Sequence, residues 1–180
     1  MAWTAPMTAV AGATFSAQEY NLYIRDNLMT TAPAKATAAG QHFVTSGARE
    51  ITARTTTGSS AAGTVTATTD IYTAKTGGPQ VTVTTGSEAL VWFAAELSND
   101  TAQGQSSCSV AATGASNVPA HNNWRLINDG TPAGQPLRAM SFHRFTELNP
   151  GSNTFTMLYR AGTTSEIASF AERHLVVMPL

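Results

Sequence analysis

Four histidines, one cysteine and eleven acids are the side chains of this 180-residue sequence that could carry out catalytic or metal chemistry. The histidines show neither the H-E-x-x-H pattern nor any helical spacing that holds zinc, so we expect scattered strand or surface residues. Cys108 lies in the alternating run S-S-C-S-V-A-A, where a buried thiol is the ordinary state. No nucleophile elbow is present, and no spacing selects a pair of acids. The sequence therefore predicts no catalytic residue, no metal site and no cofactor. The histidines are His42, His121, His143 and His174.

The charge of the chain is low and evenly balanced. Charged residues make up 12% of the sequence, the net charge is -1, and the lysines are Lys35 and Lys75. Phosphate binding needs a concentrated basic patch, so nucleic acid is not an expected partner. No run approaches the roughly 18 apolar residues of a membrane span. The first positive side chain is Arg25, too late for a signal peptide, so we expect synthesis in a cytoplasm and no membrane partner.

Aromatic residues offer one candidate ligand contact. Jelly-roll domains often bind glycans by stacking rings on sugars, and Trp124 lies among polar residues in H-N-N-W-R-L-I-N. Trp92 lies in an apolar run and is expected in the core. A half-buried structural tryptophan is the simpler interpretation of Trp124, because one ring is not a platform.

A single helix is expected near the start of the chain, over residues 16–29. An extended arm, residues 1–15, precedes it. Ser16 and Glu19 have the capping-box spacing, and Phe15 and Tyr20 have the spacing of a hydrophobic staple. Pro33 is expected to close the segment.

The helix carries two apolar stripes. Leu22 and Met29 lie nearly opposite the first stripe, whose members share three-four spacing. A helix this short is marginal alone, so two stripes suggest two partners, such as a body and a sister helix. Asn27 could then fix register in a bundle. The alternative is a monomeric helix lying across its own β domain. The first stripe comprises Tyr20, Tyr23, Ile24 and Leu28.

From residue 41 onward, short strand-like runs alternate with Asn, Gly and Pro clusters, which predicts a mainly β chain with a jelly-roll-like β-sandwich. We expect an arm-and-helix segment over residues 1–35 and the sandwich over residues 36–180. The run 90–97, L-V-W-F-A-A-E-L, is apolar on both faces and so belongs to a central strand or to a subunit interface. The Thr-rich stretch 52–69 is expected to be a long loop or linker, and 66–74, T-A-T-T-D-I-Y-T-A, to be a strand.

The segment A-W-T-A-P-M-T-A-V-A-G-A-T-F-S-A-Q-E-Y-N-L-Y-I-R-D-N-L, residues 2–28, resembles the opening of small structural proteins of tailed bacteriophages, particularly those that infect actinobacteria. Ala13 departs from the pattern, where an acid is common after the glycine, and leaves the helix cap intact. The matching residues are Trp3, Pro6, Thr8, Gly12, Ser16, Ala17, Asn21, Arg25, Asp26, Asn27 and Leu28.

The C-terminal residues 145–180 resemble, more loosely, trimeric jelly-roll heads of phage fibre and capsid-decoration proteins. The shared features are a Pro-Gly turn, a T-F-T-x-x-Y-R strand and a closing R-x-L-x-V-x-P-L. The resemblance implies a virion component with an anchoring N-terminal element and a trimeric β head.

Together these features predict a non-enzymatic virion protein, a trimeric capsid-decoration or head-fibre protein bound to the outer capsid. Its partners would be its own copies and the major capsid protein. The alternative is a minor tail or fibre protein, bound to tail components, whose β head contacts a host glycan. The residues expected to make capsid and trimer contacts are Trp3, Pro6, Tyr20, Tyr23, Ile24, Asn27 and Leu28.

Overall fold

The computed structural model describes residues 4, 7–8, 12–29, 31, 35–48 and 50–180. The chain is mainly β, as predicted, with one short helical segment and several antiparallel sheets. It divides into two compact units, Met1–Thr56 and Thr57–Leu180. The division lies later in the sequence than the boundary after residue 35 that the sequence suggested, because a β-hairpin belongs to the first unit.

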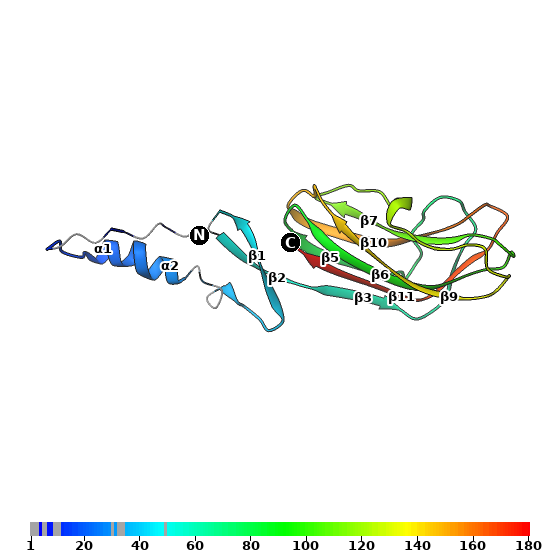
Figure 1. The fold of residues 1–180 in the computed structure, drawn as a ribbon, viewed down its shortest axis with the longest axis horizontal. Coiled ribbons are helices and arrows are strands. Elements are labelled where there is room, and N and C mark those ends of the chain that lie inside the picture. Colours follow the sequence, from blue (N-terminus) through cyan, green and yellow to red (C-terminus); the bar gives the residue numbers. More distant parts are fainter. Residues whose placement is uncertain (1–3, 5–6, 9–11, 30, 32–34, 49) are drawn as a thin grey trace. The chain divides into compact units, whose positions relative to one another are not determined.

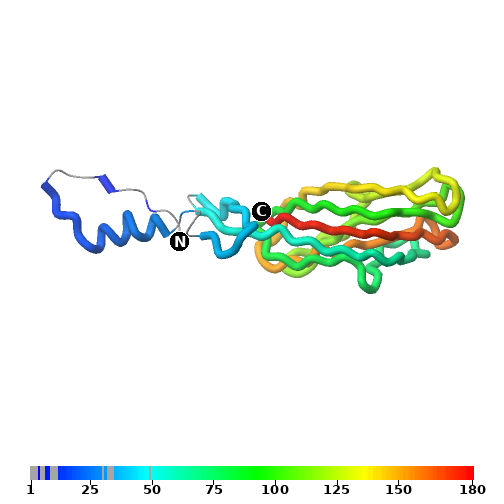
Figure 2. Tube along the Cα trace, turned by 90° about the horizontal axis from the view of Figure 1, so that it is seen from below, coloured from blue at the N-terminus to red at the C-terminus, as the bar shows by residue number. Residues whose placement is uncertain are grey.

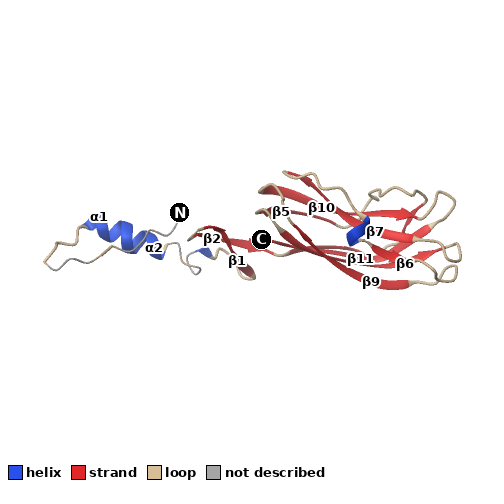
Figure 3. Cartoon of the chain, turned by 45° about the horizontal axis from the view of Figure 1, so that its top comes forward, coloured by secondary structure: helices blue, strands red, loops and turns tan. Residues whose placement is uncertain are grey.

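The helical segment of the first unit has three parts, drawn in blue in Figure 3: α1 (Ala17–Tyr20), the π-helical turn η1 (Asn21–Arg25) and α2 (Asp26–Leu28). The predicted capping box is confirmed. The Ser16 hydroxyl accepts a hydrogen bond from the Glu19 backbone N–H at 3.2 Å, and the Glu19 carboxylate accepts one from the Ser16 backbone N–H at 2.8 Å. The Phe15 and Tyr20 rings meet edge to face at 6.2 Å, which confirms the staple. Pro33 lies outside the described residues.

The hairpin of the first unit consists of β1 (Gln41–Gly47) and β2 (Glu50–Thr55), which form a two-stranded antiparallel sheet. They are the first of the short strands that the sequence predicted from residue 41 onward. The register shifts between Thr45 and Gly47, and Gly47 then pairs with Glu50.

The second unit is a β-sandwich of two antiparallel sheets (Figure 1). One sheet has the order β5-β10-β7-β8, and the other has the order β3-β11-β6-β9, with β4 also paired to β11. In Figure 2 the strands β3, β11, β6 and β9 run side by side, from cyan through red and green to yellow. The bounds are β3 (Thr57–Ala61), β4 (Val65–Ala67), β5 (Gln80–Thr85), β6 (Ala89–Asn99), β7 (Ser106–Gly114), β8 (Leu126–Asn128), β9 (Leu137–Phe145), β10 (Gly151–Ala161) and β11 (Ala168–Pro179). A 3₁₀ turn, η2 (Asn122–Trp124), precedes β8.

The core lies between the two sheets. Every second side chain of β6 is buried, and the same alternation runs along most of β10. Phe93 and Phe170 from one sheet pack with Phe155 and Tyr159 from the other in one cluster. The run 90–97 is therefore a central strand, and its alternate residues face away from the core.

Two stretches differ from their expected structure. The Thr-rich residues 52–69 contain β3 and β4, which are ordered by pairing with β11 rather than by their own apolar content. Residues 68–79 are mostly loop, and in this stretch Thr73 forms an isolated bridge to Tyr159. Local β propensity was a poor guide in both places because pairing partners decide which Thr-rich segment becomes a strand.

Strand β11 contains a β-bulge. Ala171 pairs with Glu96 and His174 pairs with Ala94, so Glu172 and Arg173 together oppose Ala95. Glu172 has a φ of 46° and its side chain is exposed, whereas Arg173 is buried. The bulge changes which alternate side chains face the core. Even-numbered residues such as Phe170 are buried before it, and odd-numbered residues such as Leu175 are buried after it.

Candidate functional site

The helix exposes most of its apolar side chains. Tyr20, Ile24 and Leu28 of the first stripe are exposed, Leu28 by 59%, and Tyr23 is half-buried. Leu22 and Met29 of the opposite stripe are exposed as well. Asn27 is the one buried residue of the segment. The helix therefore offers two apolar faces to a partner.

Asn27 holds the N-terminal arm against the helix. Its side-chain oxygen accepts a hydrogen bond from the Thr4 backbone N–H at 2.8 Å, and its amide nitrogen donates to the Thr4 carbonyl at 3.0 Å. The same nitrogen donates to the Tyr23 carbonyl at 2.9 Å. The pairing imitates a backbone bridge. Asn27 thus holds Thr4, a contact that the sequence did not suggest, and its role in fixing the register of a bundle stays a prediction.

Trp3 and Pro6, which were expected to make docking contacts, lie outside the described residues. Thr4 between them fixes the arm at one point beside Asn27.

A second apolar surface lies on the sandwich. On the outer face of the sheet β3-β11-β6-β9, Trp92 is directly opposite Phe142 on one side and Val176 on the other. The Trp92 and Phe142 rings are 5.3 Å apart, and the neighbouring pair on β9 and β6 is Met140 with Ala94. We call this surface the open sheet face. It comprises Leu90, Trp92, Ala94, Met140, Phe142, Val176 and Met178.

The open sheet face was only half foreseen. The two-sided apolar character of residues 90–97 indicated a central strand or a subunit interface. The alternation A-M-S-F in β9, which places Met140 and Phe142 on one face, was not used for this prediction. That alternation was the signal that could have located the face.

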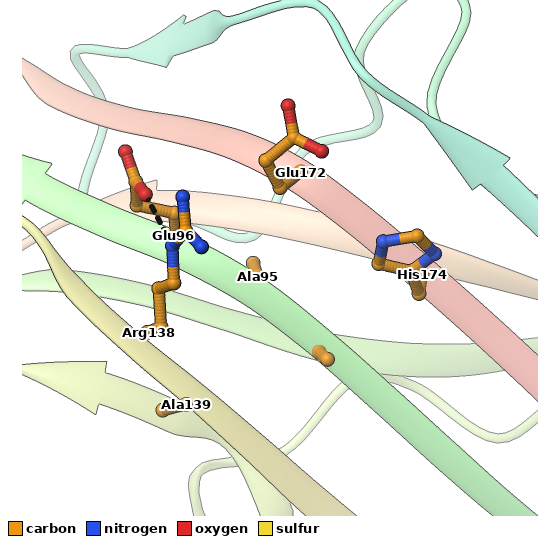
Figure 4. A pocket seen from close by; sticks show the side chains of 7 residues that line it. Ala95, Glu96, Arg138, Ala139, Glu172 and His174 are labelled. Carbon is orange, nitrogen blue, oxygen red and sulfur yellow. Dashed lines mark hydrogen bonds and ion pairs between the residues drawn. The ribbon is translucent and has the colours of Figure 1, made fainter.

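A hollow of about 260 Å³ adjoins the open sheet face (Figure 4). Arg138 donates from Nε to the Glu96 carboxylate at 2.7 Å, shown as the dashed line. Glu172 and His174 stand on the neighbouring strand β11. Glu172 and His174 are exposed, whereas Glu96 is half-buried and is engaged by Arg138. The lining residues are Ala94, Ala95, Glu96, Arg138, Ala139, Glu172 and His174.

Trp124 packs as part of the fold. Its ring stacks on His143 at 4.1 Å with an interplanar angle of 14°, and its Nε1 donates to the Val110 carbonyl at 3.1 Å. Burial in this contact lowers the pKa of His143. One ring face is already covered by His143, so the geometry does not favour Trp124 as a stacking surface for a sugar.

The remaining reactive groups are enclosed in the sandwich. Cys108 is fully buried, as predicted, and burial raises the pKa of its thiol. Burial raises the pKa of Tyr159 to about 12. The buried Arg173 donates to the Gly63 carbonyl at 2.7 Å, and its guanidinium lies 5.8 Å from the Tyr159 ring. These groups belong to the interior.

Two general features complete the site. Among the described residues there is no group of three or more His, Cys, Asp or Glu side chains placed to hold a metal ion. None of the helices in the described part of the chain combines the length and apolar character that a membrane crossing requires.

Comparison with known proteins gives no match: no protein-family model fits the sequence, and no curated protein is significantly similar to it.

Proposed function

We propose that this chain is a non-enzymatic structural protein of a phage virion, whose N-terminal unit attaches it to the particle and whose sandwich is the presented head. The observation that carries the proposal is the capped helix. It has a complete capping box and staple, and it buries only one of its residues. A short helix is marginal in water unless an apolar face is packed. A helix with good caps and open stripes is suited to burial in an assembly.

The strand order supports a jelly-roll head. The eight strands of the second unit other than β4 form two four-stranded rows, β5-β10-β7-β8 and β3-β11-β6-β9. The chain crosses from one sheet to the other at each connection, except between β3 and β4 and between β7 and β8. Two sheets that exchange the chain in this way are the pattern of a double Greek key. We propose that the head is a jelly roll and that it assembles as a homotrimer.

The outer capsid is the proposed location, with the major capsid protein as partner. A multivalent protein that bridges several shell subunits favours the assembled shell by mass action. The alternative location on the tail relied on a sugar-stacking ring. Trp124, the candidate for that role, is packed on His143, so the geometry favours the capsid proposal.

Immunogold microscopy of virions from a culture that produces the chain tests the proposal. We expect dense label over the heads. Label confined to tails would favour the tail alternative, and particles without label would contradict a virion role. Leu28→Glu tests the attachment surface, because it places a charge on an exposed stripe residue. It should abolish labelling, whereas Ile71→Glu, at an exposed loop residue of the sandwich, should leave it intact.

A further inference from the structure

The two outer faces of the sandwich differ in chemistry. On the sheet β5-β10-β7-β8, the paired outward side chains of β5 and β10 are hydroxyls and an amide: Thr82 and Thr154 share a hydrogen bond of 2.8 Å, and Gln80 donates to Thr156 at 2.9 Å. Such a face is satisfied by water. The open sheet face instead presents Trp92, as well as Phe142 exposed by 51% and Met140 exposed by 70%.

The exposed apolar area is large enough to be the centre of an interface. Large partly exposed side chains on neighbouring strands, chiefly Met140, Phe142 and Val176, leave on the order of 300 Å² of apolar surface in one patch. A stable interface buries about 800 Å² from each partner, with an apolar centre and a polar rim. The open sheet face supplies such a centre, and the hydrophilic residues around it supply the rim.

Two ion pairs lie beside the face. Arg138 binds Glu96 at one side, and Arg144 binds Glu88 at the other. Glu172 and His174 are the other ionisable groups at the adjoining hollow. A face with a strong charge of one sign would repel its own copy, whereas a nearly neutral face does not.

The open sheet face has projecting apolar side chains and, beside them, a hollow that could receive such side chains from another copy. Met140 and Phe142 are exposed on β9, which is an edge strand of its sheet. The hollow of about 260 Å³ has the small side chains of Ala94 and Ala139 on its walls. A projecting apolar side chain of one copy can therefore enter the hollow of another. Packing of this kind, with anchors in pockets, is what concentrates binding energy at the centre of interfaces.

We infer that the open sheet face is where copies of this chain bind one another, with the Met140 and Phe142 side chains of one copy packed on the β6 and β11 surface of the next. The inference names the interface of the proposed homotrimer, and it relies on that proposal only for the number of copies.

The test is the mass of the purified 180-residue chain in solution, measured by light scattering and native mass spectrometry over a dilution series. The wild-type chain should be an oligomer. Met140→Glu and Phe142→Glu should each raise its dissociation constant by about 30-fold or more, the effect of losing a central anchor. Ile71→Glu is the matched control because Ile71 is exposed by 69%, as Met140 is by 70%, and lies in a loop; it should leave the mass unchanged.

A thiol version detects the contact directly. Cys108 is buried, so a cysteine introduced by Met140→Cys is the accessible thiol of the folded chain. A bifunctional maleimide should link Met140→Cys chains covalently at concentrations where Ile71→Cys chains stay single. Circular dichroism of each variant confirms that the sandwich is folded.

The outcomes separate this inference from the proposed function. A wild-type monomer at every concentration, or an oligomer that Met140→Glu and Phe142→Glu leave intact, would overturn the inference. A particle-bound protein that is oligomeric through another surface would leave the virion role standing. Dissociation by the β9 variants, together with virions that carry no label, would support the interface and contradict the virion role.

Discussion

In the first unit, the helix from Ala17 to Leu28 has a cap, a capping box and a staple, and it buries Asn27 alone. In the second unit, strand β6 has no comparable local signal and buries every second side chain. The helix is specified by the capping residues at its N-terminus, and the strand is specified by the side chains that pack on it. An element with strong local signals and little burial is prepared for a partner, whereas an element with deep burial has its partners within the chain.

The largest test of this comparison removes a core ring. Phe93 is almost fully buried, so Phe93→Ala should lower the free energy of unfolding by about 3–5 kcal/mol. Ile24→Ala on the helix should change it by less than about 0.5 kcal/mol in the isolated chain. Urea denaturation followed by tryptophan fluorescence measures both. Equal losses would mean that the helix is packed as tightly as the core, which would break the comparison.

A buried amide gives the next effect. Asn153 is fully buried, accepts from the Ser116 backbone N–H at 2.8 Å, and donates to the Thr85 hydroxyl and the Asn149 carbonyl. Asn153→Ala removes these hydrogen bonds and leaves the buried Ser116 backbone N–H without its Asn153 acceptor, which should cost about 2–3 kcal/mol of unfolding free energy.

The matched control for Asn153→Ala is Asn117→Ala, since Asn117 is exposed, and it should be neutral within error. If the Asn153 variant were equally neutral, polar satisfaction would not be part of what holds the sandwich together.

A smaller effect is expected at the arm. Asn27→Ala removes the two hydrogen bonds to Thr4 and the one to Tyr23. Amide exchange at Thr4 should accelerate by about tenfold, equivalent to about 1–2 kcal/mol of local stability, while the sandwich unfolds at the same urea concentration. Gln18→Ala, on the exposed helix surface, should leave Thr4 exchange unchanged. A shift of the sandwich transition would show that the arm stabilises the second unit.

The smallest effect is the pH dependence of the cap. Hydrogen bonds from the Ser16 backbone and hydroxyl lower the pKa of Glu19 in the folded chain. A carboxyl with a depressed folded pKa stabilises above its ordinary value of 4.5, and that contribution is lost as pH falls through the folded value. The protection of α1 amides, relative to their intrinsic exchange rate at each pH, should therefore fall below pH 4.5. Glu19→Gln keeps the acceptor without the charge and should remove this pH dependence.

Sequence patterns predicted the elements whose signals are local or periodic. The cap at Ser16 and the burial of Cys108 follow from a few neighbouring residues, and the apolar run 90–97 indicated that β6 is a central strand or part of an interface. The pairing of strands that are far apart in the sequence could not be predicted in this way. Thr57 and its neighbours form a strand because β11 pairs with them, although β11 lies more than a hundred residues later.

The candidate surfaces show the same limit. The two stripes of the helix could be drawn from its spacing, but the bridge from Asn27 to Thr4 depends on where the arm returns. The open sheet face needed the registers of β6 with β9 and β11, which place Phe142 and Val176 on either side of Trp92. No single run of sequence contains that arrangement.

The bulge in β11 gives the end of the chain a structural reading frame. Before the bulge, even-numbered side chains such as Phe170 point inward, and after it odd-numbered ones such as Leu175 do. Deleting Glu172 would remove the bulge without changing the later pairing: Arg173 alone would oppose Ala95, His174 would still pair with Ala94, and Leu175 would stay in the core. The bulge is therefore a place where this strand can lose a residue without exchanging its two faces.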